Sequence, residues 1–281
     1  MITQQKPPLL RRRLGSRLRS MREQARLSMN EAAARLDMSR SALWRVETGE
    51  SRMDVHLARS MMDVYDIYEE GLLDQVREAL RPQWFRHYRP EDMGYVDLET
   101  EACAVCEFAV LNLPGLLQTE AYMRELFTMS TVRRTQQELD NQVEVRLIRR
   151  QRLTSDEDPL ELVAVIDESA LRREVGGPDV MRTQLCHLVE AADQPAVTVQ
   201  VLPLRGGPHL TVDGAFILLS FPEPDEPDMQ YVSYSTGSLH IDDQGEVAAA
   251  KLTFDRLRSE ALSPADSLAL IKQVGAELYG T

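Results

Sequence analysis

The chain has 281 residues, of which 43% are hydrophobic and 27% charged, proportions that are ordinary for a globular protein of about two domains. No apolar run reaches the roughly 20 residues that a membrane-spanning helix needs, and residues near the N-terminus lack the apolar region of a signal peptide, so we expect no membrane partner. Three cysteines are too few for a disulfide scaffold and are typical of a reducing compartment, which here predicts the cytoplasm.

The net charge of −13 divides unevenly along the chain. Residues 1–60 contain 13 Lys and Arg against 6 Asp and Glu, a balance of +7, whereas the remaining 221 residues balance at −20. Because nucleic acids are bound largely through contacts between positive side chains and phosphates, the basic N-terminal part indicates a DNA partner. The acidic remainder would repel DNA and confine the contact to one region.

The first predicted helix is rich in arginine. Residues 1–8 before it, with two prolines, are expected to be extended or disordered. The helix should end near Gln24, because Leu14, Leu18 and Met21 share one side. The opposite side carries Arg11, Arg12, Arg13, Arg17, Arg19 and Arg22. We interpret this side as a phosphate-contacting surface; a solvated helix face is the alternative.

Residues 28–48 predict two short helices joined by a tight turn. The apolar residues with helical spacing are Ala32, Ala33 and Leu36 in the first helix and Leu43 and Val46 in the second. Ser39 is expected to cap the second helix with its hydroxyl, and Asp37 to take a left-handed conformation in the turn. Two short helices at a steep angle form a helix-turn-helix, whose second helix enters the major groove of DNA.

One run of residues within this region is distinctive. It consists of Leu27, Ser28, Glu31, Met38, Ser39, Arg40, Ser41, Leu43, Arg45, Val46, Glu47 and Gly49. In these positions the region resembles the helix-turn-helix of the Xre/Cro family, and the resemblance implies a transcriptional regulator that binds double-stranded DNA. Two residues depart from the family pattern: Met29 replaces a Gln that often contacts phosphate, and Trp44 replaces a small polar residue. Asn30 is the expected substitute for the first contact.

A recognition helix over about residues 40–47 is predicted to make the base contacts. Arg40 and Ser41 should reach base edges or an adjacent phosphate, and Arg45 a phosphate or a base, because Arg reads guanine through two parallel hydrogen bonds. Trp44 is expected either at a thymine methyl or sugar, or packed against the first helix or a dimer partner. Glu47 is expected to pair with a nearby Arg. The predicted DNA-binding residues are Arg17, Ser28, Asn30, Ser39, Arg40, Ser41, Trp44 and Arg45.

Two further helices complete the N-terminal domain. Gly49 is expected at the C′ position of the recognition helix, and Asp54 at the N-cap of the fourth helix. The core-facing residues of that fourth helix are predicted to be Leu57, Met61 and Val64. A fifth helix is predicted near residues 69–80, ended by Pro82. This gives an all-α helix-turn-helix domain of about five helices over residues 1–81.

Residues 82–95 are interpreted as a linker, since the composition changes there from arginine-rich to acidic and apolar. Its aromatic residues Trp84, Phe85 and Tyr88 are predicted to anchor the linker against the second domain rather than to stack on bases.

Residues 96–281 alternate strand and helix patterns, which predict an α+β domain with a mixed sheet covered by helices. The predicted strands are 103–113, 160–166, 197–202, 214–221 and 229–235. The predicted helices are 120–127, 136–153, 179–191, 242–260 and 264–279, the last of them capped by Ser263. The chain is therefore expected to be multidomain.

Several short runs of the second domain carry a further family resemblance. They are residues 113–119 with Tyr122, and residues 146–152, 167–171, 199–203, 254–258 and 261–263. In these runs the domain resembles the C-terminal domain of actinobacterial Xre-type regulators of the antitoxin-like Scr1 type. The resemblance implies that the domain binds a small companion protein encoded nearby. Val232, Ser233 and Tyr234 stand where relatives often carry an acid, so a partner that uses this acid would be recognised differently here.

The common catalytic spacings are absent, so we expect no enzymatic activity; an enzymatic second domain is a remote alternative. Cys103 and Cys106 have the spacing of half a zinc site, but the adjacent pair 186–187 is a poor complement, so we expect no metal and no cofactor. Asp167 and Glu168 are interpreted as capping and charging the start of the next turn rather than as catalytic carboxylates.

The sequence leaves two hypotheses open for the role of the second domain. In the first, the protein binds a two-fold repeated operator as a homodimer, and this domain supplies dimer contacts, the companion-binding surface, or both. In the second, a mixed sheet with Gly-rich loops encloses a pocket for a small-molecule effector. These loops are residues 176–178 and 206–208, the latter near His209, and their simpler interpretation is turn chemistry. Either hypothesis predicts a cytoplasmic protein associated with the nucleoid.

Overall fold

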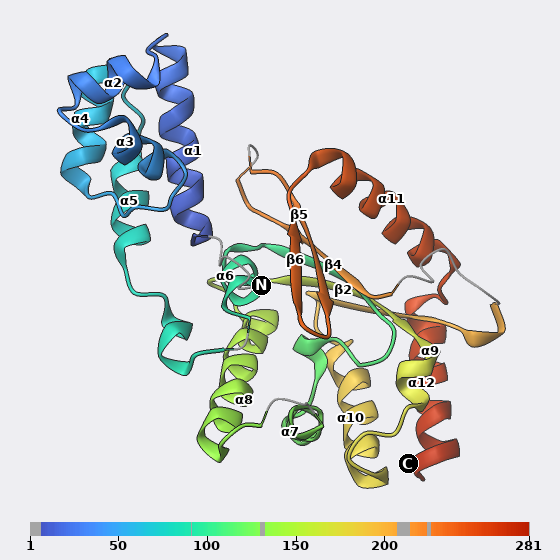
Figure 1. The fold of residues 1–281 in the computed structure, drawn as a ribbon. Coiled ribbons are helices and arrows are strands. Elements are labelled where there is room, and N and C mark those ends of the chain that lie inside the picture. Colours follow the sequence, from blue (N-terminus) through green and yellow to red (C-terminus); the bar gives the residue numbers. More distant parts are fainter. Residues whose placement is uncertain (1–6, 91, 130–132, 207–213, 224–225, 281) are drawn as a thin grey trace. The chain divides into compact units, whose positions relative to one another are not determined.

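The computed structural model describes residues 7–90, 92–129, 133–206, 214–223 and 226–280, and it divides into two compact units, residues 1–86 and 87–281 (Figure 1). Unit 1 is helical and unit 2 combines a sheet with helices, so the predicted multidomain fold is confirmed. None of the helices within the described ranges combines the length and the apolar character that a bilayer crossing requires.

Unit 1 contains the predicted bundle of short helices. They are α1 (Leu9–Gln24), α2 (Met29–Arg35), α3 (Arg40–Glu47), α4 (Val55–Tyr65) and α5 (Leu72–Leu80). Leu18, Leu43 and Met61 are fully buried in one shared core, as the helical spacing predicts. Helix α5 begins later than residue 69, because Gly71 has a left-handed φ of 80° and the regular turns start only after it.

The turn and cap chemistry of the helix-turn-helix is confirmed. Asp37 has a φ of 53°, and the Ser39 hydroxyl accepts a hydrogen bond of 3.2 Å from the backbone N–H of Ala42. Gly49, directly after the C-cap of α3, has a φ of 76°. The Asp54 carboxylate accepts a 2.8 Å hydrogen bond from the backbone of Leu57 and so caps α4. Local residue preferences therefore set where α3 begins and ends.

Helix α1 lies close against the last turn of α3 at Gly15. A Cβ atom at this position would lie 2.5 Å from the carbonyl oxygen of Glu47 and 2.6 Å from that of Val46. Only glycine therefore lets the last turn of α3 lie directly against α1.

We expect Gly15→Ala to destabilise unit 1 by about 1–3 kcal/mol, because overpacking outweighs the better helix propensity of Ala. Thermal unfolding followed by circular dichroism would measure the change. Ser16→Ala, on the exposed side of the same helix, is the matched control and should leave Tm nearly unchanged. A Gly15→Ala protein with the wild-type Tm would contradict the close packing of α1 on α3.

Unit 2 is built on a mixed sheet, for which the described residues supply six strands. They are β1 (Ala104–Ala109), β2 (Glu161–Asp167), β3 (Val197–Leu202), β4 (Phe216–Ser220), β5 (Met229–Tyr234) and β6 (Gly237–Ile241). The strand order is β3-β2-β1-β4-β5-β6. The pairs among β1, β2 and β3 are parallel, and those from β1 through β4 and β5 to β6 are antiparallel. The predicted α+β class is confirmed.

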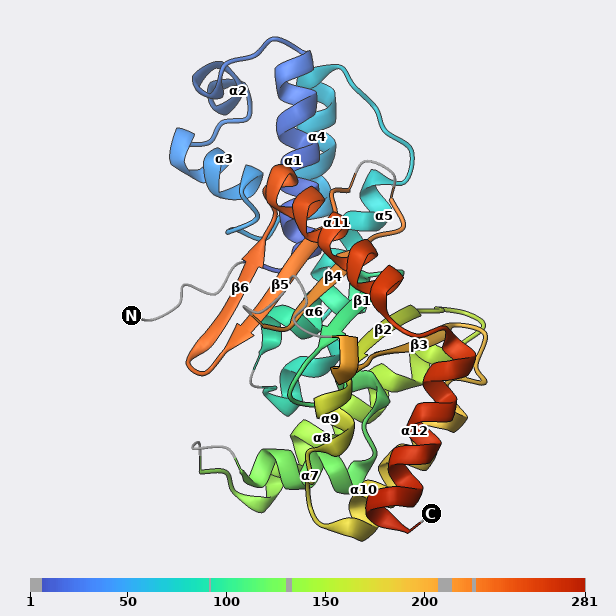
Figure 2. The ribbon, with the colours of Figure 1, turned by 90° about the vertical axis from the view of Figure 1, so that its right-hand side faces the viewer.

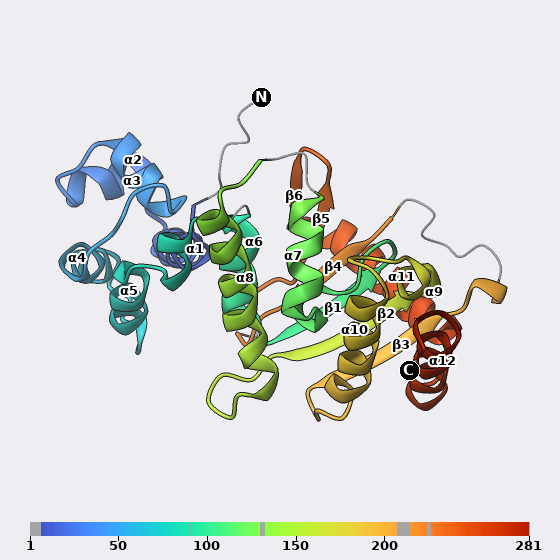
Figure 3. The ribbon, with the colours of Figure 1, turned by 90° about the horizontal axis from the view of Figure 1, so that it is seen from below.

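Helices cover both faces of this sheet. They are α6 (Met93–Glu101), α7 (Glu120–Thr128), α8 (Gln136–Gln151), α9 (Glu168–Arg172), α10 (Pro178–Ala191), α11 (Gln244–Glu260) and α12 (Pro264–Tyr279). Helix α11 packs Phe254 and Leu257 onto Phe108 and Phe216 of one face. Helices α7, α8 and α10 lie on the opposite face (Figures 2 and 3). Short 3-10 helices lie at η1 (Trp84–Tyr88), η2 (Gly115–Leu117), η3 (Arg152–Thr154) and η4 (Leu204–Gly206).

Three elements of unit 2 differ from the sequence pattern. Helix α6 lies partly inside the predicted linker; Val96, Leu98 and Glu99 are buried, so no single apolar stripe marks it. Strand β6 is a five-residue edge strand in which only Leu239 and Ile241 alternate with polar residues, a pattern too short to predict a strand. The sequence pattern predicts no helix at α9; only the capping role of Asp167 is confirmed, since its carboxylate accepts a hydrogen bond from the Ser169 N–H at 2.9 Å.

Candidate nucleic-acid interface

Helix α3 presents one polar side to solvent. Arg40, Ser41, Trp44 and Arg45 are all exposed, whereas the core-facing residues of the helix are buried. The Trp44 side chain is 48% exposed, so it does not pack into the core of unit 1. Among the residues that the structure describes, neither Arg40 nor Arg45 forms an ion pair. Both guanidinium groups are therefore available to an external acceptor.

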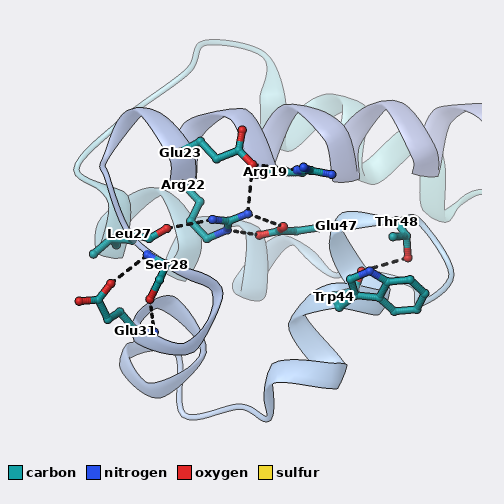
Figure 4. A network of polar contacts seen from close by, with 9 residues as sticks. All are labelled: Arg19, Arg22, Glu23, Leu27, Ser28, Glu31, Trp44, Glu47 and Thr48. Atoms are coloured by element: carbon teal, nitrogen blue, oxygen red, sulfur yellow. Dashed lines mark hydrogen bonds and ion pairs between the residues drawn. The ribbon is translucent and has the colours of Figure 1, made fainter. Parts of the chain in front are cut away.

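A buried ion pair fastens α3 to α1. The Arg22 guanidinium donates from Nε to Glu47 Oε1 at 2.7 Å and from Nη2 to Glu47 Oε2 at 3.0 Å (Figure 4). Its Nη1 also donates to the Leu27 carbonyl at 2.9 Å, which ties the loop before α2 to the same group. Arg22 is 6% exposed and Glu47 is 4% exposed. The hydrogen bond to Glu47 raises the pKa of Arg22.

This ion pair confirms one prediction from the sequence and contradicts another. The expectation that Glu47 pairs with an arginine is confirmed. The expectation that Arg22 contributes to a phosphate-contacting surface is wrong, because its guanidinium is enclosed between α1 and α3.

Arg17 is directed toward another part of unit 1. Its Nη1 donates to Gln75 Oε1 at 2.9 Å, and its guanidinium forms an ion pair with Glu69. Arg19, the next exposed arginine of α1, pairs with Glu23 at 2.9 Å. Arg17 and Arg19 therefore have partners within unit 1, and the Arg17 guanidinium is directed to α5 and the loop before it rather than to the exposed side of α3.

The remaining predicted residues lie at the starts of α2 and α3. Ser28 and Glu31 form a capping box, in which the Glu31 N–H donates to Ser28 Oγ at 3.3 Å and the Ser28 N–H donates to Glu31 Oε2 at 2.9 Å (Figure 4). Asn30 is exposed, whereas Met29 packs against the core. The sequence pattern Ser-x-x-Glu from Ser28 to Glu31 is the signature of this capping box.

The Ser39 and Ser41 hydroxyls lie 3.1 Å apart at the N-terminus of α3, beside exposed Arg40. With Trp44 and Arg45 they form one exposed side, which we call the α3 outer side: Ser39, Arg40, Ser41, Trp44 and Arg45. Its hydroxyl and guanidinium donors suit phosphate oxygens and the acceptor atoms of guanine.

Unit 2 contains a cleft of about 740 Å³ that sequence reasoning did not locate. It lies between the sheet and helices α6 and α8, and its lining includes Tyr95, Glu107, Phe127, Arg146 and Tyr231. The loop 176–178, predicted as a possible pocket wall, is not part of it. Residues 207–209 of the second such loop lie outside the described residues.

The three cysteines are free thiols, and burial raises the pKa of Cys106. In the part of the chain that the structure describes, no three His, Cys, Asp or Glu side chains converge in a metal-binding cluster.

Two stretches of the chain match known family models. Residues 13–75 match a model described as a helix-turn-helix domain, which contains α2, α3 and their turn. Residues 93–273 match a model described as a domain of unknown function, DUF5753, which contains the whole sheet of unit 2. No curated protein and no solved structure matches the chain.

Proposed function

Because the chain belongs to the DUF5753 family and carries a helix-turn-helix domain ahead of that domain, we propose that it is a sequence-specific transcriptional regulator. The observation that carries the proposal is the contrast within α3. Glu47 is held in a buried ion pair, whereas Arg40 and Arg45 are exposed and form no ion pair within the described residues. A helix anchored at one side and supplied with donors on the other is suited to the major groove.

The finer family assignment is also a proposal. The helix-turn-helix is of the Xre/Cro type, supported by the residue pattern around Ser39 to Gly49 and by the turn conformation at Asp37. Unit 2 is of the actinobacterial, antitoxin-like Scr1 type, supported by the recurrent runs described above. A regulator of this kind acts at the nucleoid, so we assign the protein to the cytoplasm. The proposal gives unit 2 a regulatory role and no catalytic one.

The operator is proposed to be a two-fold repeat bound by a homodimer, since one α3 outer side offers few base contacts. Selection of binding duplexes from a random library by the full-length protein, followed by footprinting, would test both parts. We expect two inverted half-sites whose centres lie about 10 bp, or a multiple of this, apart. A single asymmetric site occupied by a monomer would contradict the dimer. Failure to enrich any sequence would contradict specific DNA binding.

Unit 2 is further proposed to bind a small companion protein. Besides the family resemblance, the edge strand β6 and its hairpin support this, because Tyr234 is 50% exposed and Leu239 is 52% exposed. An open strand edge flanked by apolar side chains suits a partner that adds a strand. Co-purification of the full-length chain with the product of a short neighbouring reading frame would test the proposal, with Leu239→Lys expected to abolish it.

The alternative function is an effector-responsive regulator. The cleft between the sheet and α8 favours it, because clefts of about 300–1,000 Å³ are the usual size of small-molecule sites. In this case ligand binding to unit 2 would change the affinity of the protein for its operator.

A further inference from the structure

The cleft of unit 2 has a carboxylate on its sheet side. Strand register pairs Glu107 of β1 with Ile217 of β4, and Ile217 with Tyr231 of β5, so these three side chains form one row across the sheet. The neighbouring residue Phe108 points to the opposite face, where α11 packs. Glu107 is thus a charged residue in an otherwise apolar strand, and within the described residues its side chain has no hydrogen-bond or ion-pair partner.

Helix α8 forms the facing wall. Gln142, Val145, Arg146 and Arg149 follow the spacing of one helix side, and all four line the cleft. The Arg149 charge is compensated, because its guanidinium pairs with buried Glu99 of α6 and lies 5.0 Å from the centre of the Tyr95 ring.

The Arg146 charge is not compensated in this way. Its Nη1 donates to the neutral side chain of Gln118, and its guanidinium lies 4.4 Å from the centre of the Phe127 ring. Within the described ranges it forms no ion pair, with Glu107 or with any other carboxylate. Asp92, at another part of the lining, is already engaged, since it accepts hydrogen bonds from Tyr231 at 2.8 Å and Ser238 at 2.7 Å.

Two charges of opposite sign therefore face one cleft without pairing to each other. Holding unpaired charges in a partly desolvated site is unfavourable, and a ligand with matching charges would relieve this. We propose that the cleft binds a small zwitterion of the amino-acid or short-peptide class, with its carboxylate against Arg146 and its ammonium group against Glu107. Apolar and aromatic lining residues such as Phe127, Val145 and Ile217 would contact the remainder of the ligand.

This proposal rests on the effector alternative above, but its test needs no DNA, so a failure to bind ligand and a failure to bind operator are separate results. Isothermal titration calorimetry on the full-length protein would use the common amino acids in one series and di- and tripeptides in the other. Binding by either series supports the proposal and identifies the source of the ligand. The absence of binding in both series would overturn it.

Charge-removing variants test the two contacts. We expect Glu107→Gln and Arg146→Gln each to weaken binding at least tenfold, whereas Glu144→Gln, on the exposed side of α8, should bind as the wild type does. N-acetylated or amidated derivatives of the best probe should also bind at least tenfold more weakly. Unchanged binding by both cleft variants, or equal binding of the blocked derivatives, would overturn the proposal.

The pH dependence of wild-type binding requires no variant. Burial and the charge of Glu99 raise the pKa of Glu107 to about 7, while the pKa of Arg146, lowered by burial to about 10, keeps that group positive. The charged and titratable groups around Glu107 are Tyr95 and Glu99 of α6, Arg146 and Arg149 of α8, and Tyr231 of β5. Since the ionised fraction of Glu107 rises about tenfold between about pH 6 and pH 8, affinity should rise by a similar factor. A flat profile would contradict the role of Glu107.

Discussion

Arg40→Ala and Arg45→Ala are each expected to weaken operator binding by roughly 1–3 kcal/mol, or about 5- to 150-fold, without changing Tm. Both side chains are exposed and form no ion pair among the described residues, so their loss removes contacts to DNA and none within the fold. Electrophoretic mobility shifts with the selected operator would measure the affinity, and circular dichroism the Tm.

The salt dependence separates the two kinds of contact that each arginine can make. Loss of a phosphate contact should reduce the slope of log affinity against log salt by about one, whereas loss of a base contact should mainly relax sequence preference at one position. Arg59→Ala, an exposed arginine of α4 outside the helix-turn-helix, is the matched control and should bind as the wild type. Full-strength complexes with both α3 variants would rule out α3 as the recognition helix.

Breaking the buried ion pair between α1 and α3 should have the largest effect on stability. In Glu47→Gln or Arg22→Met one buried partner loses its counter-charge, and such losses typically destabilise a domain by about 3–5 kcal/mol. Because the chain has two units, a single melting curve would combine two transitions; hydrogen exchange of the amides in α1 and α3 resolves unit 1 alone.

The double variant Arg22→Met with Glu47→Leu is the control for charge burial. It removes both charges together, so it should recover much of the protection that either single variant loses. If Glu47→Gln kept wild-type exchange rates in α3, the ion pair would not be what holds the helix. The single variants should also lose operator binding, but with a loss of stability that Arg40→Ala does not show.

Local chemistry made the helix-turn-helix predictable. The bounds of α3, the cap at Ser39 and the left-handed turn at Asp37 depend on residues within a few positions of one another, and all three are confirmed. The roles of Arg17 and Arg22 were not predictable in this way. Their partners Glu69 and Glu47 lie 52 and 25 residues away in the chain, so helix spacing alone cannot show which arginines are already paired.

Unit 2 shows the same limit. The longer strands are predicted from their apolar alternation, whereas the alternation in β6 covers only five residues and the enclosed helix α6 has no apolar stripe. Glu107 within an apolar strand was a visible clue to the cleft. Its relation to Arg146 depends on strand register and on how α8 lies over the sheet, which the sequence pattern does not contain.

The attachment of α3 is concentrated at one end. Gly15 contacts the carbonyls of Val46 and Glu47, and Arg22 holds the Glu47 carboxylate, so the last turn is fixed while Arg40 and Ser41 project from the first. In the proposed complex with DNA, Arg40 and Ser41 would therefore reach the bases from the end of this eight-residue helix that is not anchored, while Arg45 would contact DNA from the anchored last turn. We expect that substitutions in the first turn of α3 would change the DNA sequence preference without loss of stability, as long as Gly15, Arg22 and Glu47 are kept.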